Sequence, residues 1–134
     1  MKYLGLVLFI AFTSRASFAQ NPAQYRACTE KAQTQAEMNA CSNEEATRVD
    51  AEMNRIYARL LSKAQGDPEG RAKIRAAERA WIAYRDAYID AMCPANNKQA
   101  EYGSIYPMEV DLLGAKLTRQ QITALKELLQ QFSR

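Results

Sequence analysis

The longest amphipathic pattern in the chain runs from about residue 34 to residue 65, without a glycine or proline. Its apolar residues recur at helical spacing opposite a charged face, at Met38, Val49, Met53, Ile56 and Leu60. Thr34 and Glu37 have the spacing of a capping box, and Gly66 follows the last apolar position. The pattern therefore predicts a long helix over 34–65.

A second apolar stripe occupies the next segment, between Asp67-Pro68, which is typical of a helix start, and Pro94, which ends it. The stripe lies at positions i, i+3, i+7, i+10 and i+14: Ile74, Ala77, Trp81, Tyr84 and Tyr88. We predict a helix that buries this stripe, in which Trp81 and Tyr84 are structural residues. On this prediction, Trp81→Ala destabilises the fold by about 3–5 kcal/mol.

Shorter helical segments flank these two. Asn21-Pro22 opens a short helix through about Gln33, and Pro107 permits a segment through Lys116 that Gly114 weakens. Thr118 begins a second capping-box pattern before a last amphipathic stretch, whose apolar residues are Ile122, Leu125, Leu128 and Leu129. No segment has a strand pattern. We expect an all-α fold, a small antiparallel helical domain built on two long helices plus shorter N- and C-terminal helices.

The N-terminus has the order of a secretory signal peptide. Lys2 precedes an apolar run over 3–12, and Ser17 and Ala19 are small residues at the two positions that a signal peptidase reads. The run is too short to span a bilayer, which disfavours the alternative of an uncleaved anchor. We predict a signal peptide over 1–19, one domain over 20–134, a periplasmic or secreted location, and no stable membrane insertion after cleavage.

Composition narrows the function classes. Cleavage lowers the formal net charge from +3 to +1, because all fifteen acidic residues remain, and so gives no argument for nucleic acid as a partner. The chain has no histidine, which removes the commonest zinc ligand and every Ser-His or Cys-His dyad. We therefore expect no metal, no cofactor and no enzymatic activity. The rival class is a glycosidase using Asp86 and Asp90, one turn apart, although such aspartates more often pair with arginines.

Three cysteines in an oxidising compartment suggest one disulfide and one remaining thiol. Cys28 and Cys41 flank Thr34 at similar distances, so a helical hairpin reversing at Thr34 places them opposite each other. We predict this disulfide; the alternative is two unpaired buried thiols. Cys93 is then either a buried apolar residue or the seat of an intermolecular bridge.

Several segments together resemble the secreted bacterial domain named for the lysozyme inhibitor LprI. They are "CTEKAQTQAEMNAC", "AERAWIAYRDA", "YGSIYPM" and "LTRQQ", within roughly Cys28 to Leu125. Members of that family usually carry a second cysteine pair, whose positions match Ile89 and Leu113 here. The resemblance implies a small helical binding protein that blocks a lysozyme-type muramidase in the envelope.

Such an inhibitor presents a rigid surface to the enzyme's cleft. The candidate contacts are Tyr102 and Tyr106 in the loop over 96–106, together with Arg85 and Asp86. The tyrosines are equally compatible with packing under the loop, and Arg85 and Asp86 with fixing a neighbouring helix. The acidic first half of the 34–65 helix suits a basic lysozyme, with Glu37, Glu44, Glu45, Asp50 and Glu52. The alternative function is a periplasmic adaptor, or an assembly or stress protein, that docks another envelope protein through the amphipathic last helix.

Overall fold

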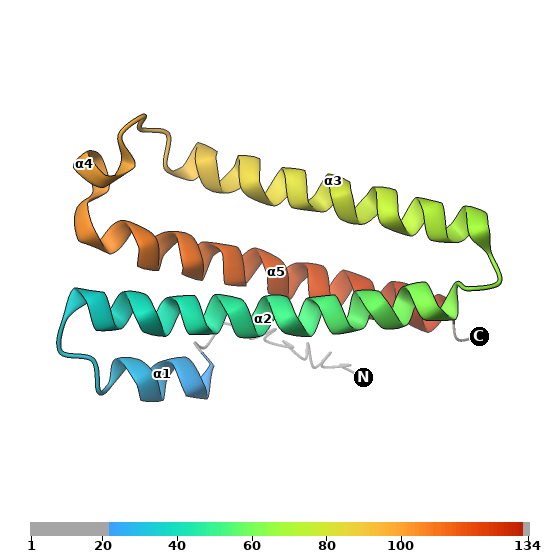
Figure 1. Ribbon diagram of the computed structural model, residues 1–134, viewed down its shortest axis with the longest axis horizontal. Coiled ribbons are helices and arrows are strands. Elements are labelled where there is room, and N and C mark those ends of the chain that lie inside the picture. The colour runs from blue at the N-terminus through green and yellow to red at the C-terminus, as the bar shows by residue number, and fades with distance from the viewer. Residues whose placement is uncertain (1–21, 133–134) are drawn as a thin grey trace, which may run out of the picture.

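The computed structural model describes residues 22–132, so the predicted signal peptide over 1–19 lies outside the described residues. Within them the chain forms helices and no strand, which confirms the all-α class (Figure 1). The elements are α1 (Ala23–Thr29), α2 (Gln35–Lys63), α3 (Pro68–Met92), α4 (Lys98–Tyr102), a 3-10 turn η1 (Gly103–Ile105) and α5 (Tyr106–Gln131).

The ends of α2 and α3 follow from local chemistry. Thr34 Oγ1 accepts a hydrogen bond from the Glu37 N–H at 3.2 Å, and the Glu37 carboxylate accepts one from the Thr34 N–H at 2.9 Å. This reciprocal pair is the predicted capping box. Asp67 caps α3 by accepting from the Gly70 N–H at 2.9 Å. Both predicted helix starts are therefore confirmed.

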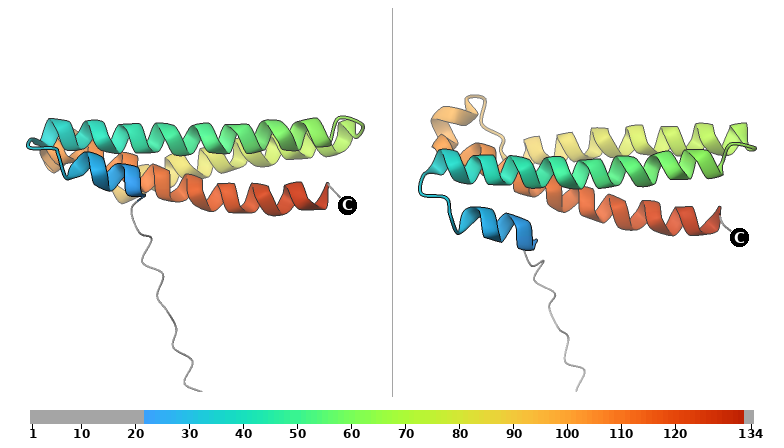
Figure 2. Two further views of the ribbon diagram at one scale, coloured as in Figure 1. Left: turned by 90° about the horizontal axis from the view of Figure 1, so that it is seen from below. Right: turned by 60° about the horizontal axis from the view of Figure 1, so that its bottom comes forward.

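The main packing in the molecule joins α2 and α5, which run parallel to each other (Figures 1 and 2). Side-chain pairs advance along both helices in the same direction, from Ser42–Asp111 through Asp50–Thr118 to Glu52–Lys126. Helix α3 returns the chain antiparallel to both. The expectation that the helices over 34–65 and 68–93 form the dominant antiparallel pair is therefore wrong, because α2 places its apolar face against α5.

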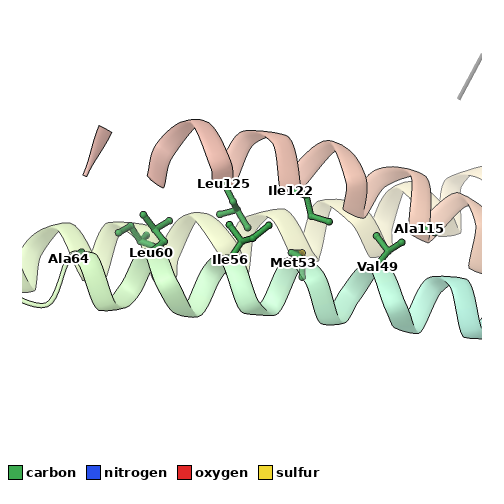
Figure 3. Close-up of a cluster of buried hydrophobic side chains, with 9 residues drawn as sticks. Val49, Met53, Ile56, Leu60, Ala64, Ala115, Ile122 and Leu125 are labelled. Carbon is green, nitrogen blue, oxygen red and sulfur yellow. The ribbon is translucent and has the colours of Figure 1, made fainter. Parts of the chain in front are cut away.

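The hydrophobic core lies along this parallel pair (Figure 3). Its buried members are Val49, Met53, Ile56, Leu60, Ala64, Ile74, Ala115, Ile122 and Leu125. Only Ile74 in this set belongs to α3, so that helix contributes little fully buried apolar surface. Burial of each large aliphatic side chain contributes about 1.5–3 kcal/mol.

Helix α5 is continuous through the two positions where the sequence suggested a break. Thr118 is fully buried, and its hydroxyl donates to Asp50 Oδ1 at 3.0 Å. It is therefore not an N-cap but a polar contact between α5 and α2. Gly114 is an interior helical residue opposite Ile89. The predicted separation of a segment ending at Lys116 from a last helix beginning at Thr118 is wrong.

The inward face of α3 differs from the predicted stripe. Ala77, Tyr84 and Tyr88 are exposed, Tyr84 by 56 % and Tyr88 by 39 %, so the prediction that they are buried is wrong. Trp81 is half-buried and packs against the core. From Ile74 onwards the buried and half-buried positions of the helix are Ile74, Glu78, Trp81, Arg85 and Ile89.

Candidate partner-binding surface

A disulfide between Cys28 and Cys41 fastens α1 to the first half of α2. Their Cα atoms are 5.7 Å apart, as the predicted reversal at Thr34 requires, and this prediction is confirmed. Tyr25 on α1 is buried and lines the same pocket as the two cysteines. A bridge closing a loop of this length stabilises the fold by about 3 kcal/mol, mainly by restricting the unfolded chain.

The acidic half of α2 is not one anionic face. The Glu45 side chain is only 2 % exposed and its carboxylate bonds to Arg48 at 2.7 Å and to Arg119 of α5. Asp50 accepts from Thr118, and Glu37 is engaged in the capping box. Glu52 pairs with Lys126 of α5 at 3.1 Å, so four of the five acidic residues hold helices or helix ends, and Glu44 stays exposed without an ion pair in the described chain.

The environment shifts the pKa of two acidic groups near these contacts in opposite directions. Backbone N–H groups of Gln33 and Thr34 hydrogen-bond to the Glu37 carboxylate and lower its pKa. Partial burial raises the pKa of Asp111, although a hydrogen bond from Ser42 opposes the effect. The capping carboxylate is thus stabilised in its charged form, whereas the interhelical one is not.

A compact polar frame holds the segment between α3 and α5. The Lys98 ammonium bonds to Asp90 at 2.6 Å and to the Cys93 carbonyl, and its hydrogen bond to Asp90 raises the pKa of Lys98. The Ala95 N–H donates to the Tyr102 hydroxyl at 3.2 Å. Gly103 adopts φ 67° and ψ −156°, a region open essentially only to glycine. The segment therefore has a defined conformation.

The two loop tyrosines stack on each other. The Tyr102 and Tyr106 ring centroids are 5.7 Å apart and both residues are half-buried. Asn39 of α2 donates to the neighbouring Ser104 carbonyl at 2.9 Å, which ties the segment to the core pair. Ile105, between the tyrosines, is 38 % exposed. The tyrosines thus support the segment and also contribute to its surface.

Arg85 connects α3 to α2. Its guanidinium lies 5.1 Å from the Trp81 ring centroid, 3.0 Å from Asp86 and 3.9 Å from Asp50. The Arg85 side chain is 22 % exposed, whereas that of Asp86 is 61 % exposed. The structure favours a helix-fixing role for Arg85 and leaves Asp86 at the surface.

The end of the molecule where α4 lies, formed by the last turns of α3, α4, η1 and the start of α5 (Figure 1), carries exposed acidic residues and half-buried tyrosines. We call this set the α4-end surface: Asp86, Asp90, Glu101, Tyr102, Ile105, Tyr106 and Glu109. Glu101 and Glu109 have no ion pair among the described residues. Because Asp86 and Asp90 each pair with a cation of their own, they do not form the free carboxylate pair that the glycosidase alternative needs.

Sequence periodicity missed a second exposed feature of α3. Tyr84 and Tyr88 have ring centroids 5.8 Å apart, and Met92, one turn later, is 57 % exposed. Their spacing of four residues is visible in the sequence, but periodicity alone predicts that it belongs to a core stripe. The amphipathic face of α5, in contrast, is occupied by α2, which removes the basis for an adaptor docking through it.

Cys93 is free and buried at the end of α3. Its burial favours a packing role over an exposed bridging thiol. Ile89, one turn earlier, lies 3.7 Å from where a methyl group on Gly114 would be, next to Leu113. Helices α3 and α5 therefore approach each other close to the positions of the family's second cysteine pair.

The described residues contain neither a metal-binding cluster nor a membrane-spanning helix. No group of three or more Cys, Asp and Glu side chains within 22–132 is placed to hold a metal ion. None of the helices in that range has the length and apolar character needed to cross a membrane.

Comparison with known proteins identifies relatives. The family described as lysozyme inhibitor LprI matches residues 28–125. An uncharacterised protein of Rhizobium meliloti (strain 1021) is 31 % identical over 137 aligned positions, covering 94 % of this chain and 93 % of that protein. No solved structure matches.

Proposed function

The chain belongs to the LprI family of lysozyme inhibitors, and from this premise we propose that it is an exported binding protein of the bacterial envelope that inhibits lysozyme-type muramidases by protein–protein contact. The family match spans most of the domain. A location in the periplasm or outside the cell agrees with the signal peptide expected over 1–19 and with the disulfide between Cys28 and Cys41.

The α4-end surface is the part of the molecule that we propose contacts the muramidase. The observation that carries this proposal is a rigid segment that combines an exposed apolar side chain, Ile105, with stacked tyrosines and unpaired carboxylates. A segment already held in one conformation loses little entropy on binding. Aromatic residues are common anchors of protein interfaces, and surrounding charges set the rate of encounter.

The charge of this surface suits a basic enzyme. Asp86 and Asp90 are offset by Arg85 and Lys98, whereas Glu101 and Glu109 are exposed without a cationic partner in the described chain. The surface therefore carries a net negative charge beside its aromatic centre. Such charge complementarity accelerates association at low salt.

Purified protein over 20–134 should bind at least one class of lysozyme and slow its clearing of a peptidoglycan suspension. The double variant Glu101→Lys/Glu109→Lys should lower the association rate about tenfold at low ionic strength. Glu127→Lys is the control for the single variant Glu109→Lys, because each changes the charge by the same amount on α5, at exposed positions about 27 Å apart along the helix axis. Absence of binding to every lysozyme class would contradict the inhibitor function, and equal effects of Glu109→Lys and Glu127→Lys would contradict this surface.

A further inference from the structure

Helices α3 and α5 leave a cleft between them on the side of the molecule away from α4. Its volume is about 210 Å³ and its walls are mainly apolar, with Ile74 and Trp81 from α3 and Leu125 and Leu128 from α5. Ala77 and Ala124, both exposed, lie among the lining residues. The space is below the roughly 300–1,000 Å³ of pockets for drug-sized ligands, so it suits one side chain or a small molecule.

A buried carboxylate lines this apolar cleft. Glu78 is 6 % exposed, and its Oε2 accepts a hydrogen bond from Gln121 Nε2 at 2.9 Å. No cation pairs with Glu78 among residues 22–132, and its second oxygen is not sealed away from solvent. A buried carboxylate with one neutral donor lacks the cation that ordinarily compensates its loss of hydration.

Trp81 forms the aromatic wall of the cleft, and its ring already meets one cation of the same helix. Trp81 already holds the Arg85 guanidinium 5.1 Å from its ring centroid, an arrangement typical of a cation–π contact. Arg75, one turn before Glu78, is exposed and forms no ion pair with it in the described chain. Among residues 22–132, therefore, no cation pairs with the Glu78 carboxylate, although Arg85 lies over the ring of Trp81.

We propose that the α3–α5 cleft binds a primary alkylammonium group, the chemistry of a lysine side chain or of a small free amine. The ammonium pairs with the Glu78 carboxylate, and the apolar stem lies against Trp81, Leu125 and Leu128. A compact ammonium with an unbranched stem matches a narrow apolar cleft that has one carboxylate in its lining. This site is separate from the α4-end surface and does not depend on inhibition of a muramidase.

The single tryptophan of the chain provides a direct readout, because Trp81 lines the cleft. Titration of the mature protein with n-butylammonium should change the Trp81 emission saturably, with an affinity about tenfold or more above that for neutral 1-butanol. An equal response to amine and alcohol would overturn the proposal. So would unchanged emission together with an unchanged indole N–H resonance up to tens of millimolar amine.

Substitutions inside and outside the cleft separate a loss of amine binding from a loss of folding. Glu78→Gln keeps the size of the side chain and removes its charge, so the affinity for n-butylammonium should fall about tenfold, to that of 1-butanol. Glu69→Gln, an exposed position on α3 that pairs with Lys73, should bind as the wild type does. Wild-type affinity in Glu78→Gln would overturn the site. If that variant fails to fold, Ala124→Leu tests the same cleft by filling it, and undiminished amine binding would overturn the proposal.

A further arm distinguishes the source of the ligand. Nα-acetyl-lysine N-methylamide presents the amine as a polypeptide does. Binding of this compound and of n-butylammonium, both lost in Glu78→Gln, supports a lysine side chain of another protein as the occupant. Binding of n-butylammonium alone supports a small free amine. Loss of neither in Glu78→Gln overturns the proposal.

Discussion

Two ionisable side chains occupy inward positions of α3 where apolar residues are usual. Glu78 bonds to Gln121 of α5, and Arg85 reaches toward Asp50 of α2 while covering Trp81. These contacts compensate for the partial loss of hydration of each side chain. The orientation of α3 is therefore set partly by polar contacts with its two neighbouring helices.

This arrangement explains why the stripe on α3 could be predicted only in part. Ile74 and Trp81 belong both to the predicted line and to the observed inward face. Tyr84 and Tyr88 were placed inside because hydrophobic periodicity counts Glu78 and Arg85 as outward residues. Their true positions depend on partners in α2 and α5, which local sequence does not reveal.

Trp81 and Tyr84 should therefore differ in their effect on stability. Trp81→Ala removes an indole that packs on the core and supports Arg85, and it should lower the free energy of unfolding by about 2–4 kcal/mol. Tyr84→Ala removes an exposed ring and should change it by less than about 0.5 kcal/mol. Urea unfolding followed by circular dichroism measures both, and losses of equal size would contradict the assigned orientation of α3.

The capping glutamate predicts a pH dependence of stability. Because the pKa of Glu37 in the fold lies below the ordinary value of 4.5, its ionised form stabilises the fold above that pH. This contribution is lost as the pH falls through the lowered pKa. Glu37→Gln should therefore lose less unfolding free energy than the wild type between pH 7 and pH 3, as urea titrations at both values would show. An acid-induced loss of equal size in both proteins would contradict a stabilising role for the ionised cap.

The helices differ in how far their boundaries depend on local interactions. The starts of α2 and α3 could be predicted because Thr34, Glu37 and Asp67 bond to backbone groups only three residues away. The continuity of α5 could not be predicted, because the sequence around Thr118 has the pattern of an N-cap. Only the folded structure shows that the Thr118 hydroxyl donates to Asp50 of α2. Thr118 therefore lies in the interior of α5, although its sequence pattern predicts a helix start.

Gly114 provides a test of the continuity of α5. A methyl group added at Gly114 would lie 3.7 Å from its nearest neighbour, Ile89 Cδ1, which is an ordinary contact distance. Gly114→Ala should therefore raise the free energy of unfolding by about 0.5–1 kcal/mol, because alanine favours a helix interior. Gly103→Ala, at φ 67°, should instead lower it by about 1–3 kcal/mol. Destabilisation by Gly114→Ala in thermal or urea unfolding would indicate that the helix does not run uninterrupted through this position.

At the scale of the whole molecule, α3 acts as a return connection that lets α2 and α5 lie parallel. The short connection over 64–67 makes α2 and α3 run in opposite directions, but it does not decide which helix faces pack together. Which apolar faces meet depends on residues about 70 positions apart, such as Asp50 and Thr118. The all-α class could therefore be predicted from the local sequence pattern, whereas the packing of α2 against α5 could not.

This division of the core predicts unequal local stability. Helix α3 places only Ile74 in the buried cluster and borders the α3–α5 cleft, while α2 and α5 supply most of the other members. Regions with fewer buried apolar contacts open at lower free energy than the global unfolding. Native-state hydrogen exchange should therefore show the central amides of α3 opening before those of α2 and α5. Ile74→Ala should weaken protection in α3 more than in the parallel pair, because it removes the main apolar anchor of α3. Exchange of the α3 amides only through global unfolding would contradict this prediction. It would mean that α3 is as stable as α2 and α5, and that the polar contacts of Glu78 and Arg85 contribute strongly to its packing.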